Sequence, residues 1–438
     1  MVRCQRRADD SAVPAASPSR AGYPANAGPA RTEVIATDMS DESTPGATEA
    51  PPAPVDGEAA ARFAPVREAF AKSFEDLGEV GAAFCLRLGG EVVVDVWGGW
   101  QDAERTRPWQ RDTLVNAYSV GKGVLAGLLM CVVEEGRLSF DDRVVEVWPE
   151  FGAHGKDGIT VRMLSSHQAG LPALREKLDR SHLYDWAGLC ERLADEEPYW
   201  TPGTAHGYHV NMYGFLVGEV IHRATGMPVA EALSHYMTGP AGADFFFSVP
   251  DADHARCTDM LVPNYDLDSE EKWAIAFPPT GDRDFDVMKW HTYFNPPGIS
   301  GVGSVHTAEW KRSVIPSTSG HATARAVAAL YAGMMGSGVE LAVTPGARVR
   351  GEATRGEVDG DDVILQRPSR FGIGFQLPIP TRPLGPSASA FGHYGYGGAL
   401  GFADPENDLA FGYLMNLPGD RWQTPRTQRL IDTVYDCL

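Results

Sequence analysis

The chain has 438 residues, 43% of them apolar, and its 38 basic and 58 acidic side chains give a formal net charge of −20. The apolar content is enough to bury a core over most of the length, so a chain disordered throughout is excluded. The acidic balance argues against a nucleic-acid or anionic-membrane partner and disfavours acidic substrates, because each would meet repulsion over most of the surface.

The first 58 residues differ in composition from the rest. They contain 8 of the 32 prolines and no Leu, Phe or Trp. Such a segment cannot bury enough apolar surface to offset the entropy of ordering it. We therefore expect residues 1–58 to form a disordered Pro/Ala-rich tail and residues 59–438 to form the folded domain.

The next segments predict a helix, a hairpin and a buried helix. Apolar residues recur at helical spacing in residues 58–77, and apolar or alternating runs flank Gly89-Gly90, which indicates a β-hairpin. Residues 119–138 are mostly apolar and predict a buried helix that ends near Gly136. Residues 140–335 consist of helix-like segments separated by loops rich in Pro, Gly and Asp.

The C-terminal stretch returns to strands. Residues 371–379 and 399–416 predict strands, the second pair joined by a turn at Asp404-Pro405-Glu406-Asn407, and residues 424–437 predict a last helix. Strands and helices at both ends predict one sheet built from both termini, with a helical subdomain at about 140–335 inserted between them.

The cysteines and apolar runs bear on the compartment. Six cysteines, at positions 4, 85, 131, 190, 257 and 437, include no C-x-x-C pair, which fits neither a disulfide scaffold nor a zinc ribbon. No signal peptide is visible, and no apolar run approaches the roughly 18 to 20 residues of a membrane helix. We expect a cytoplasmic protein without a metal site or a membrane partner.

The chemistry centres on an S-x-x-K sequence, because no GxSxG elbow, HExxH pair, P-loop or GxGxxG occurs. Ser119 and Lys122 lie three residues apart at the start of the buried helix, so they share one helix face, where the free amides of a helix N-terminus favour an oxyanion. A desolvated lysine could take the serine proton. The alternative is a helix-capping serine with a lysine that reaches solvent. A second S-x-x-K begins at Ser269 in a charged stretch, which we interpret as a surface segment.

Two further features suit a catalytic site. Tyr208 stands at a loop-to-helix junction, where it can act as a proton shuttle if a nearby lysine lowers its pKa. Residues 392–398 are rich in glycine before a strand, so a backbone amide there could complete an oxyanion hole. Taken singly, the alternatives are a half-buried tyrosine and a β-turn.

The order S-x-x-K, then Tyr, then His-x-Gly on a late strand resembles the serine β-lactamase and penicillin-binding-protein superfamily, especially its class C-like branch of family VIII carboxylesterases. The resemblance covers about residues 60–438 and includes the blocks MLSSHQAGLPAL and YHVNMYGFLVGEVI. It implies the β-lactamase/transpeptidase-like α/β (α+β) fold, an antiparallel sheet flanked by helices. It also implies a serine hydrolase that needs no cofactor.

By this resemblance Ser119 corresponds to the acylated nucleophile, Lys122 to its base and Tyr208 to the group that protonates the leaving group. His393 and Gly395 match the third motif, where relatives have Lys-Thr-Gly, and the amides of Ser119 and Tyr396 would form the oxyanion hole.

Two departures favour esters over β-lactams. The Tyr-x-Asn motif would need Asn at 210, where this chain has Val210 followed by Asn211, and His393 replaces the lysine that holds a substrate carboxylate. We therefore expect a carboxylesterase acting on a small neutral ester. A β-lactamase or D-aminopeptidase, an acyltransferase with the same nucleophile, and an inactive binding protein are the alternatives. The natural substrate, acyl-chain length and oligomeric state are left open.

Overall fold

The computed structural model describes residues 53–262, 279–419 and 422–438. The strands are β1 (Val55–Ala59), β2 (Gly81–Leu88), β3 (Glu91–Gly99), β4 (Val115–Asn116), β5 (Phe245–Phe246), β6 (His321–Ala322), β7 (Val358–Asp361), β8 (Pro368–Phe371), β9 (Phe391–Tyr394), β10 (Leu400–Asp404) and β11 (Leu409–Met415). The helices are α1 (Ala64–Asp76), α2 (Val120–Glu134), α3 (Val161–Ser165), α4 (Trp186–Asp195), α5 (Met212–Thr225), α6 (Val229–Leu233), α7 (Gly239–Ala241), α9 (Arg283–Phe294), α10 (Ala308–Arg312), α11 (Ala324–Met335), α12 (Ala347–Ala353) and α13 (Pro425–Asp436).

A six-stranded antiparallel sheet is built from both ends of the chain, as the sequence predicts. Its strand order is β1-β3-β2-β11-β10-β9. The predicted hairpin joins β2 to β3 through Gly89 and Gly90, whose φ angles of 57° and 80° are rarely adopted by residues with a side chain. The second predicted hairpin joins β10 to β11, with Phe402 opposite Phe411.

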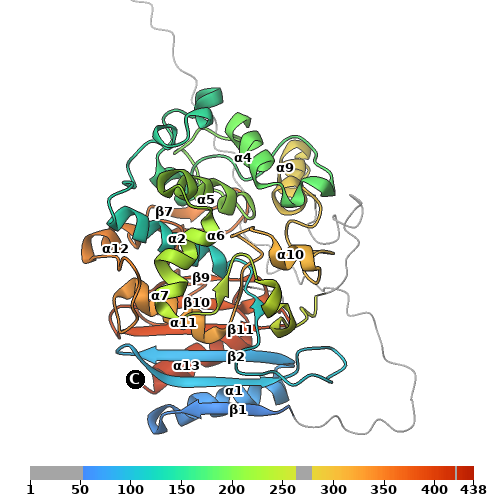
Figure 1. Cartoon of the computed structure of the whole chain (residues 1–438), viewed down its shortest axis with the longest axis vertical. Coiled ribbons are helices and arrows are strands. Elements are labelled where there is room, and N and C mark those ends of the chain that lie inside the picture. The colour runs from blue at the N-terminus through green and yellow to red at the C-terminus, as the bar shows by residue number, and fades with distance from the viewer. Residues whose placement is uncertain (1–52, 263–278, 420–421) are drawn as a thin grey trace, which may run out of the picture. The chain divides into compact units, whose positions relative to one another are not determined.

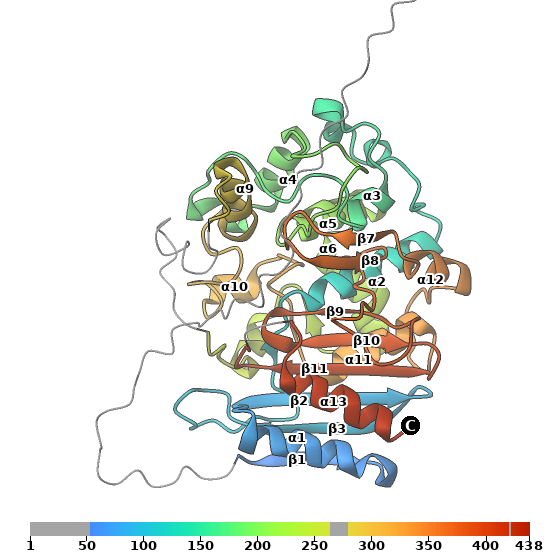
Figure 2. The same cartoon turned by 180° about the vertical axis from the view of Figure 1, so that it is seen from behind.

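Helices cover both faces of this sheet. α1 and α13 pack against each other on one face, which is turned to the viewer in Figure 2. α11 packs against β2, β10 and β11 and also contacts α2. The large buried side chains of β2 and β11, such as Phe84 and Phe411 with ring centroids 4.8 Å apart, form the core between these layers.

α2 lies between the sheet and the helical region that contains α3, α4, α5 and α9 (Figures 1 and 2). It contacts β9 on one side and α5 on the other, and every residue from Val120 to Val133 is buried. A helix that is apolar on all sides is expected to be buried in this way. The N-terminus of α2 therefore opens at the border between sheet and helices.

Three boundaries differ from the sequence predictions. β1 begins at Val55, so the last residues of the predicted tail pair with β3. The expected strand at 371–379 is replaced by a bend, in which Gln376 alone bridges to Gly392. α11 lies on the sheet rather than in the helical subdomain. Each difference is set by long-range pairing or packing, which local composition does not report.

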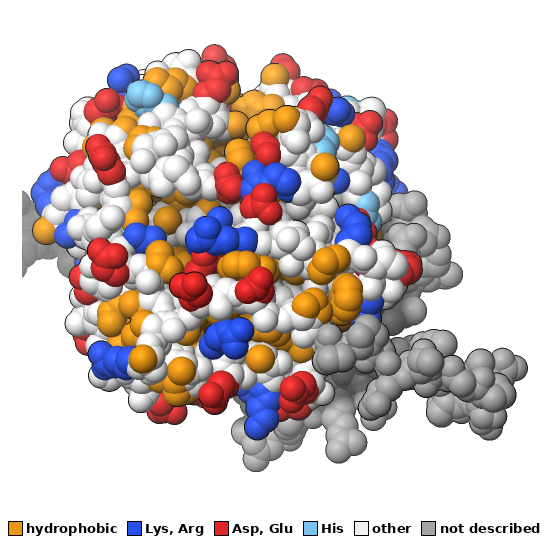
Figure 3. Space-filling view, turned by 60° about the horizontal axis from the view of Figure 1, so that its bottom comes forward, with side chains coloured by type: hydrophobic (Ala, Val, Ile, Leu, Met, Phe, Trp, Pro, Cys, Tyr) orange, Lys and Arg blue, Asp and Glu red, His pale blue; other side chains and the backbone are white. Residues whose placement is uncertain are grey.

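The described surface and cysteines add further detail. On the face drawn in Figure 3, basic and acidic side chains are interspersed, with apolar patches between them.

The cysteines at 85, 131, 190, 257 and 437 are free thiols. Among the described residues no helix is long and apolar enough to cross a membrane, and no group of His, Cys, Asp and Glu side chains could hold a metal ion. The second S-x-x-K, at Ser269, lies outside these residues.

Candidate active site

Ser119 lies at the N-terminus of α2. It is the N-cap residue of that helix, but its hydroxyl makes no capping hydrogen bond. The preceding residue, Tyr118, has a φ of 47°, in the left-handed region that residues with a side chain rarely occupy. The Tyr118 ring packs edge-on against Tyr396, with centroids 5.4 Å apart. The serine hydroxyl is therefore presented on a constrained backbone and is not used by the helix.

Lys122 lies one helical turn after Ser119 and is fully buried. Its Nζ is 3.0 Å from Ser119 Oγ and donates to the carbonyl oxygen of Ser317 at 3.1 Å. Burial holds the pKa of Lys122 well below its ordinary value, because it disfavours the charged ammonium. The neutral amine keeps a lone pair for the serine proton. These contacts rule out the alternative of a capping serine beside a lysine that reaches solvent.

Tyr208 approaches Lys122 from the loop before α5. Its ring centroid lies 4.9 Å from Lys122 Nζ, and its buried hydroxyl has no hydrogen-bond partner among the described residues. Burial raises the pKa of Tyr208, and the neighbouring Ser119 hydroxyl only partly offsets this rise. The expectation that a lysine lowers this pKa is wrong, because a neutral lysine supplies no positive charge. Tyr208 is a protonated phenol and is suited to donate a proton.

Two buried side chains that the sequence analysis missed hold Tyr208 in place. The Asp362 carboxylate accepts a hydrogen bond from the Tyr208 amide at 3.0 Å, across 154 residues of chain, and accepts from two further amides. The His167 ring packs 5.0 Å from the Tyr208 ring, and its Nδ1 accepts from the His209 amide. His167 lies in the block MLSSHQAGLPAL, but the sequence does not assign it to Tyr208, and no quoted block contains Asp362. The fold brings both residues to Tyr208.

His393 lies on β9 and is fully buried, with its ring centroid 6.0 Å from that of Tyr208. Its Nδ1 donates to the Tyr394 carbonyl at 2.7 Å, so Nε2 carries the lone pair, and Nε2 has no partner in the described part of the chain. Burial holds the pKa of His393 well below its ordinary value, because it disfavours the charged imidazolium. The residue therefore brings a neutral acceptor rather than a cation to the site.

Gly395 brings the backbone after β9 close to the turn that carries Ser119. A Cβ at Gly395 would lie 2.6 Å from the carbonyl oxygen of Ala117 and 3.3 Å from Cγ2 of Val120. Only glycine fits this approach, which explains the glycine of the third motif. The Tyr396 side chain is 45% exposed. The oxyanion hole predicted from the amides of Ser119 and Tyr396 stays a prediction.

Replacing Gly395 by alanine should lower kcat/KM for an ester by about tenfold or more and destabilise the fold by about 1–3 kcal/mol, because the added methyl group meets backbone and must displace β9. Initial rates and thermal unfolding would measure both effects. Gly351→Ala is the matched control, since a Cβ at Gly351 meets nothing within 4 Å. Unchanged activity in Gly395→Ala would contradict the close approach.

Asn211 is occupied by the protein itself. Its Nδ2 donates to the carbonyl oxygens of Thr292 and Tyr293 at the end of α9, and its Oδ1 accepts from Thr318 Oγ1 at 3.0 Å. Val210 stands where the lactamase motif needs asparagine. Asn211 therefore offers no free side-chain amide to an acylamino group.

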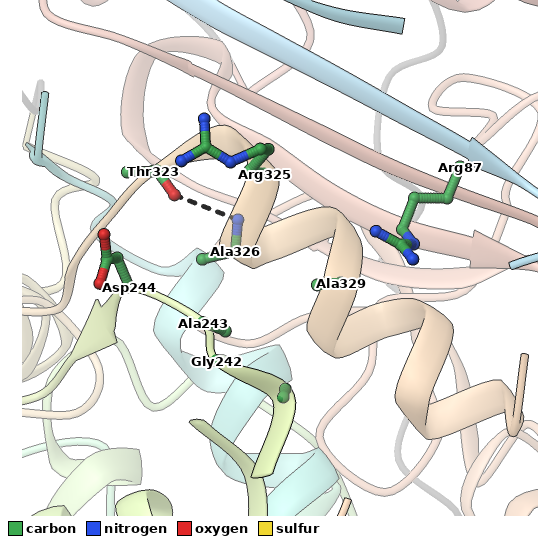
Figure 4. A pocket seen from close by; sticks show the side chains of 9 residues that line it. Arg87, Gly242, Ala243, Asp244, Thr323, Arg325, Ala326 and Ala329 are labelled. Carbon is green, nitrogen blue, oxygen red and sulfur yellow. Dashed lines mark hydrogen bonds between the residues drawn. The ribbon is translucent and has the colours of Figure 1, made fainter. Parts of the chain in front are cut away.

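A separate pocket of about 140 Å³ lies between β2, α11 and the end of α7, lined among others by Arg87, Asp244 and Arg325 (Figure 4). Its Asp244 carboxylate is paired with Arg256. The pocket shares no residue with the Ser119 cluster and includes none of the residues singled out in the sequence.

Comparisons with known proteins agree with this geometry. Residues 66–434 match the family model described as Beta-lactamase. Over 368 residues the chain is 32% identical to the protein named Esterase/beta-lactamase LipL of Mycobacterium tuberculosis, covering 82% of each chain. It is 28% identical over 202 residues to Esterase EstB of Burkholderia gladioli, covering 42% of this chain and 51% of that one.

Solved structures give the same picture. A family VIII carboxylesterase superposes with a TM-score of 0.79 at 35% identity, covering 88% of this chain and all of that one. A penicillin-binding-protein homologue from Caulobacter crescentus superposes with a TM-score of 0.76 at 37% identity, also over 88% of this chain and all of the other. The antiparallel sheet with flanking helices is thus the β-lactamase/transpeptidase-like fold.

Proposed function

Because the chain belongs to the β-lactamase family, we propose that it is a serine carboxylesterase that cleaves small carboxylic esters through an acyl-enzyme on Ser119. The observation that carries this proposal is the buried amine of Lys122, 3.0 Å from a serine hydroxyl that caps no helix amide. Relatives named as esterases and a family VIII carboxylesterase structure support it.

In the acylation step, neutral Lys122 takes the Ser119 proton while Oγ forms a bond to the ester carbonyl carbon. The oxyanion that develops is stabilised by backbone amides, those of Ser119 and Tyr396 in our prediction. The C–O bond to the alcohol then breaks, and Tyr208 gives its proton to the leaving oxygen and recovers one from Lys122. This exchange returns the lysine to its neutral form.

In the deacylation step, the same groups act on water. Lys122 takes a proton from water while the water oxygen attacks the acyl carbon. That proton is passed to Ser119 Oγ when the carboxylic acid leaves. Protein residues move every proton, and each turnover restores the starting state. His393, held neutral beside Tyr208, is placed to accept a hydrogen bond from water or substrate.

The alternatives differ in the acyl acceptor and the bond cleaved. Asn211 is bound within the protein and His393 is neutral, which weigh against an acylamino amide and against a carboxylate held at the third motif. An acyltransferase would use the same acyl-enzyme. It is distinguished from an esterase by transfer of the acyl group to an added alcohol in place of water.

A panel of 4-nitrophenyl esters of increasing chain length, assayed beside the β-lactam nitrocefin, tests the proposal. We expect kcat/KM for the acetate or butyrate to exceed that for nitrocefin by about tenfold or more, because the site lacks the amide handle of a β-lactamase. Faster turnover of nitrocefin would favour the β-lactamase, and loss of free acid on adding an alcohol would favour the acyltransferase. Neither ester cleavage nor a mass gain with a fluorophosphonate would favour an inactive binding protein.

We also propose a reducing, cytoplasmic compartment. The described cysteines are free thiols, and four of them are buried. Cell fractionation with an antibody to the chain would test this placement.

A further inference from the structure

A buried cation without a counter-ion lies near the site. Arg382 is 6% exposed, and its Nη2 has no hydrogen-bond partner in the described chain. It forms no ion pair with a described carboxylate. Buried arginines are ordinarily paired, because an unpaired charge loses its hydration without compensation. An unpaired guanidinium held inside the fold therefore points to a ligand.

The loop that carries Arg382 is fastened to the strand of the third motif. Arg382 and Ile379 close a tight turn, with the Arg382 amide donating to the Ile379 carbonyl at 2.8 Å. The next residue, Pro383, accepts hydrogen bonds from the Tyr394 hydroxyl on β9 at 3.2 Å and from Gln423 Nε2 at 3.3 Å. These contacts hold the backbone that carries Arg382 in place before any ligand binds.

Trp422 connects this cation to the catalytic cluster. The Cζ atoms of Arg382 and Arg367 each lie 5.0 Å from the centre of the indole, which lies 5.2 Å from the Tyr208 ring. Arg367 is exposed, so the cluster reaches solvent on that side. Both guanidiniums lie against the Trp422 indole, and this indole contacts Tyr208, which is proposed to protonate the leaving oxygen. Positive charge therefore lies beside the proposed active site.

Asp362 is the acidic residue that acts on Arg382, and its oxygens already accept hydrogen bonds from other groups of the protein. Asp362 raises the pKa of Arg382, but burial and Arg367 outweigh it and lower that pKa to about 10, so Arg382 stays charged at neutral pH. The Asp362 oxygens accept from the Tyr208 amide, from two more amides and from the Ser369 hydroxyl. Asp362 sets one negative charge against the two positive charges of Arg382 and Arg367, so these three groups together are positive although the chain as a whole is acidic.

We propose that Arg382, with Arg367 and Trp422, forms a subsite for a carboxylate, so that the preferred substrates are esters that also carry a negative charge. This inference rests on the proposed esterase activity and names its substrate class. The carboxylate belongs either to the acyl part of the ester or to its alcohol. Both place the same anion beside the guanidinium, and matched substrates distinguish them.

The test compares two pairs of esters. For the acyl side, the 4-nitrophenyl monoester of adipic acid is compared with 4-nitrophenyl heptanoate. For the alcohol side, 4-acetoxybenzoate is compared with 4-acetylphenyl acetate. In Arg382→Met, kcat/KM for the anionic member of one pair should fall by about tenfold to a hundredfold, while its neutral partner changes less than about twofold. Arg382→Lys should restore part of the loss.

Further variants guard against trivial outcomes. Arg367→Met changes an exposed residue and should give a smaller loss in the same direction, which keeps the test decisive if Arg382→Met fails to fold. Arg348→Met, at an exposed residue on α12 paired with Glu352, makes the same change in net charge and should leave both ratios unchanged. Equal ratios in the wild type and in both cluster variants would overturn the subsite but not the esterase.

A binding measurement separates the two proposals. Titration calorimetry of Ser119→Ala protein with 4-hydroxybenzoate and with adipate should show binding of at least one, lost when Arg382→Met is added. Lack of ester cleavage with this binding intact would contradict the esterase and support the subsite. Absence of binding of either anion to Ser119→Ala would overturn the subsite.

Discussion

Ser119→Ala should abolish the cleavage of 4-nitrophenyl butyrate, with kcat/KM falling by about 10⁴-fold or more, because it removes the hydroxyl that lies 3.0 Å from the Lys122 amine and is proposed to form the acyl-enzyme. The fold should survive, since the Ser119 hydroxyl makes no capping hydrogen bond. Initial rates together with thermal unfolding would establish both points. A fluorophosphonate should add its mass to the wild type at the peptide that contains Ser119, and not to the variant.

The matched control is the serine of the other S-x-x-K. Ser269→Ala removes the same hydroxyl from the same four-residue pattern and should leave kcat/KM unchanged, because we interpret that segment as surface. Full activity in Ser119→Ala would exclude the proposed nucleophile. Loss of activity in Ser269→Ala together with full activity in Ser119→Ala would mean that the nucleophile was assigned to the wrong serine.

Lys122→Met should remove ester cleavage by about 10³-fold or more and at the same time raise the melting temperature. The catalytic loss follows from removing the base 3.0 Å from Ser119 Oγ. The melting temperature should rise because burying an amine costs solvation free energy, and a methionine side chain of similar length does not incur that cost. This gain should exceed the loss of the hydrogen bond to the Ser317 carbonyl. Calorimetry and initial rates on one preparation would test the two effects together.

The pH dependence has a definite sign. Burial holds the Lys122 pKa below its unfolded value of about 10.4. Burial of Lys122 therefore lowers the free energy of unfolding by the full amount when the pH is below the folded pKa. This loss disappears as the pH rises to the unfolded pKa. The stability advantage of Lys122→Met should shrink toward alkaline pH. The kcat/KM of the wild type should fall as the pH drops through the folded pKa, because a protonated amine cannot accept the serine proton.

Lys156→Met is the control for this substitution. Lys156 is also fully buried, but its Nζ donates to the Glu196 carbonyl, and no described contact joins it to Ser119. Its replacement should leave kcat/KM within about twofold of wild type. A Lys122→Met protein that keeps its activity would refute the assigned base, and one that melts lower than wild type would refute the destabilising burial.

Much of the architecture could be read from local patterns. The glycine pair at 89–90 and the turn at 404–407 each predicted a hairpin, because turn chemistry acts within four residues. The strand predicted at 371–379 was wrong, although its composition suits a strand. Whether such a segment pairs depends on the neighbour that the fold supplies. Here Phe371 ends β8, and the rest of the segment forms isolated bridges such as Gln376 to Gly392 in place of a strand.

The site divides in the same way. Ser119 and Lys122 could be paired from spacing alone, since residues i and i+3 share a helix face in any fold. The contact of Lys122 with the Ser317 carbonyl and those of Tyr208 with Asp362 and His167 could not be found, because a backbone oxygen has no sequence signal and the two side chains lie far along the chain from Tyr208.

The sequence by itself determined the family and the order of the three motifs, and it is the basis on which we propose Ser119 as nucleophile and Lys122 as base, because these depend on residue identity and short spacing. Only the tertiary structure decided the direction in which the pKa values of Lys122, Tyr208 and His393 shift, since a pKa follows burial and partners that long-range packing creates. It likewise decided the charge beside the site. The net charge of −20 suggested a neutral substrate, whereas the field in a pocket is set by the few groups that the fold gathers there, Arg382 among them.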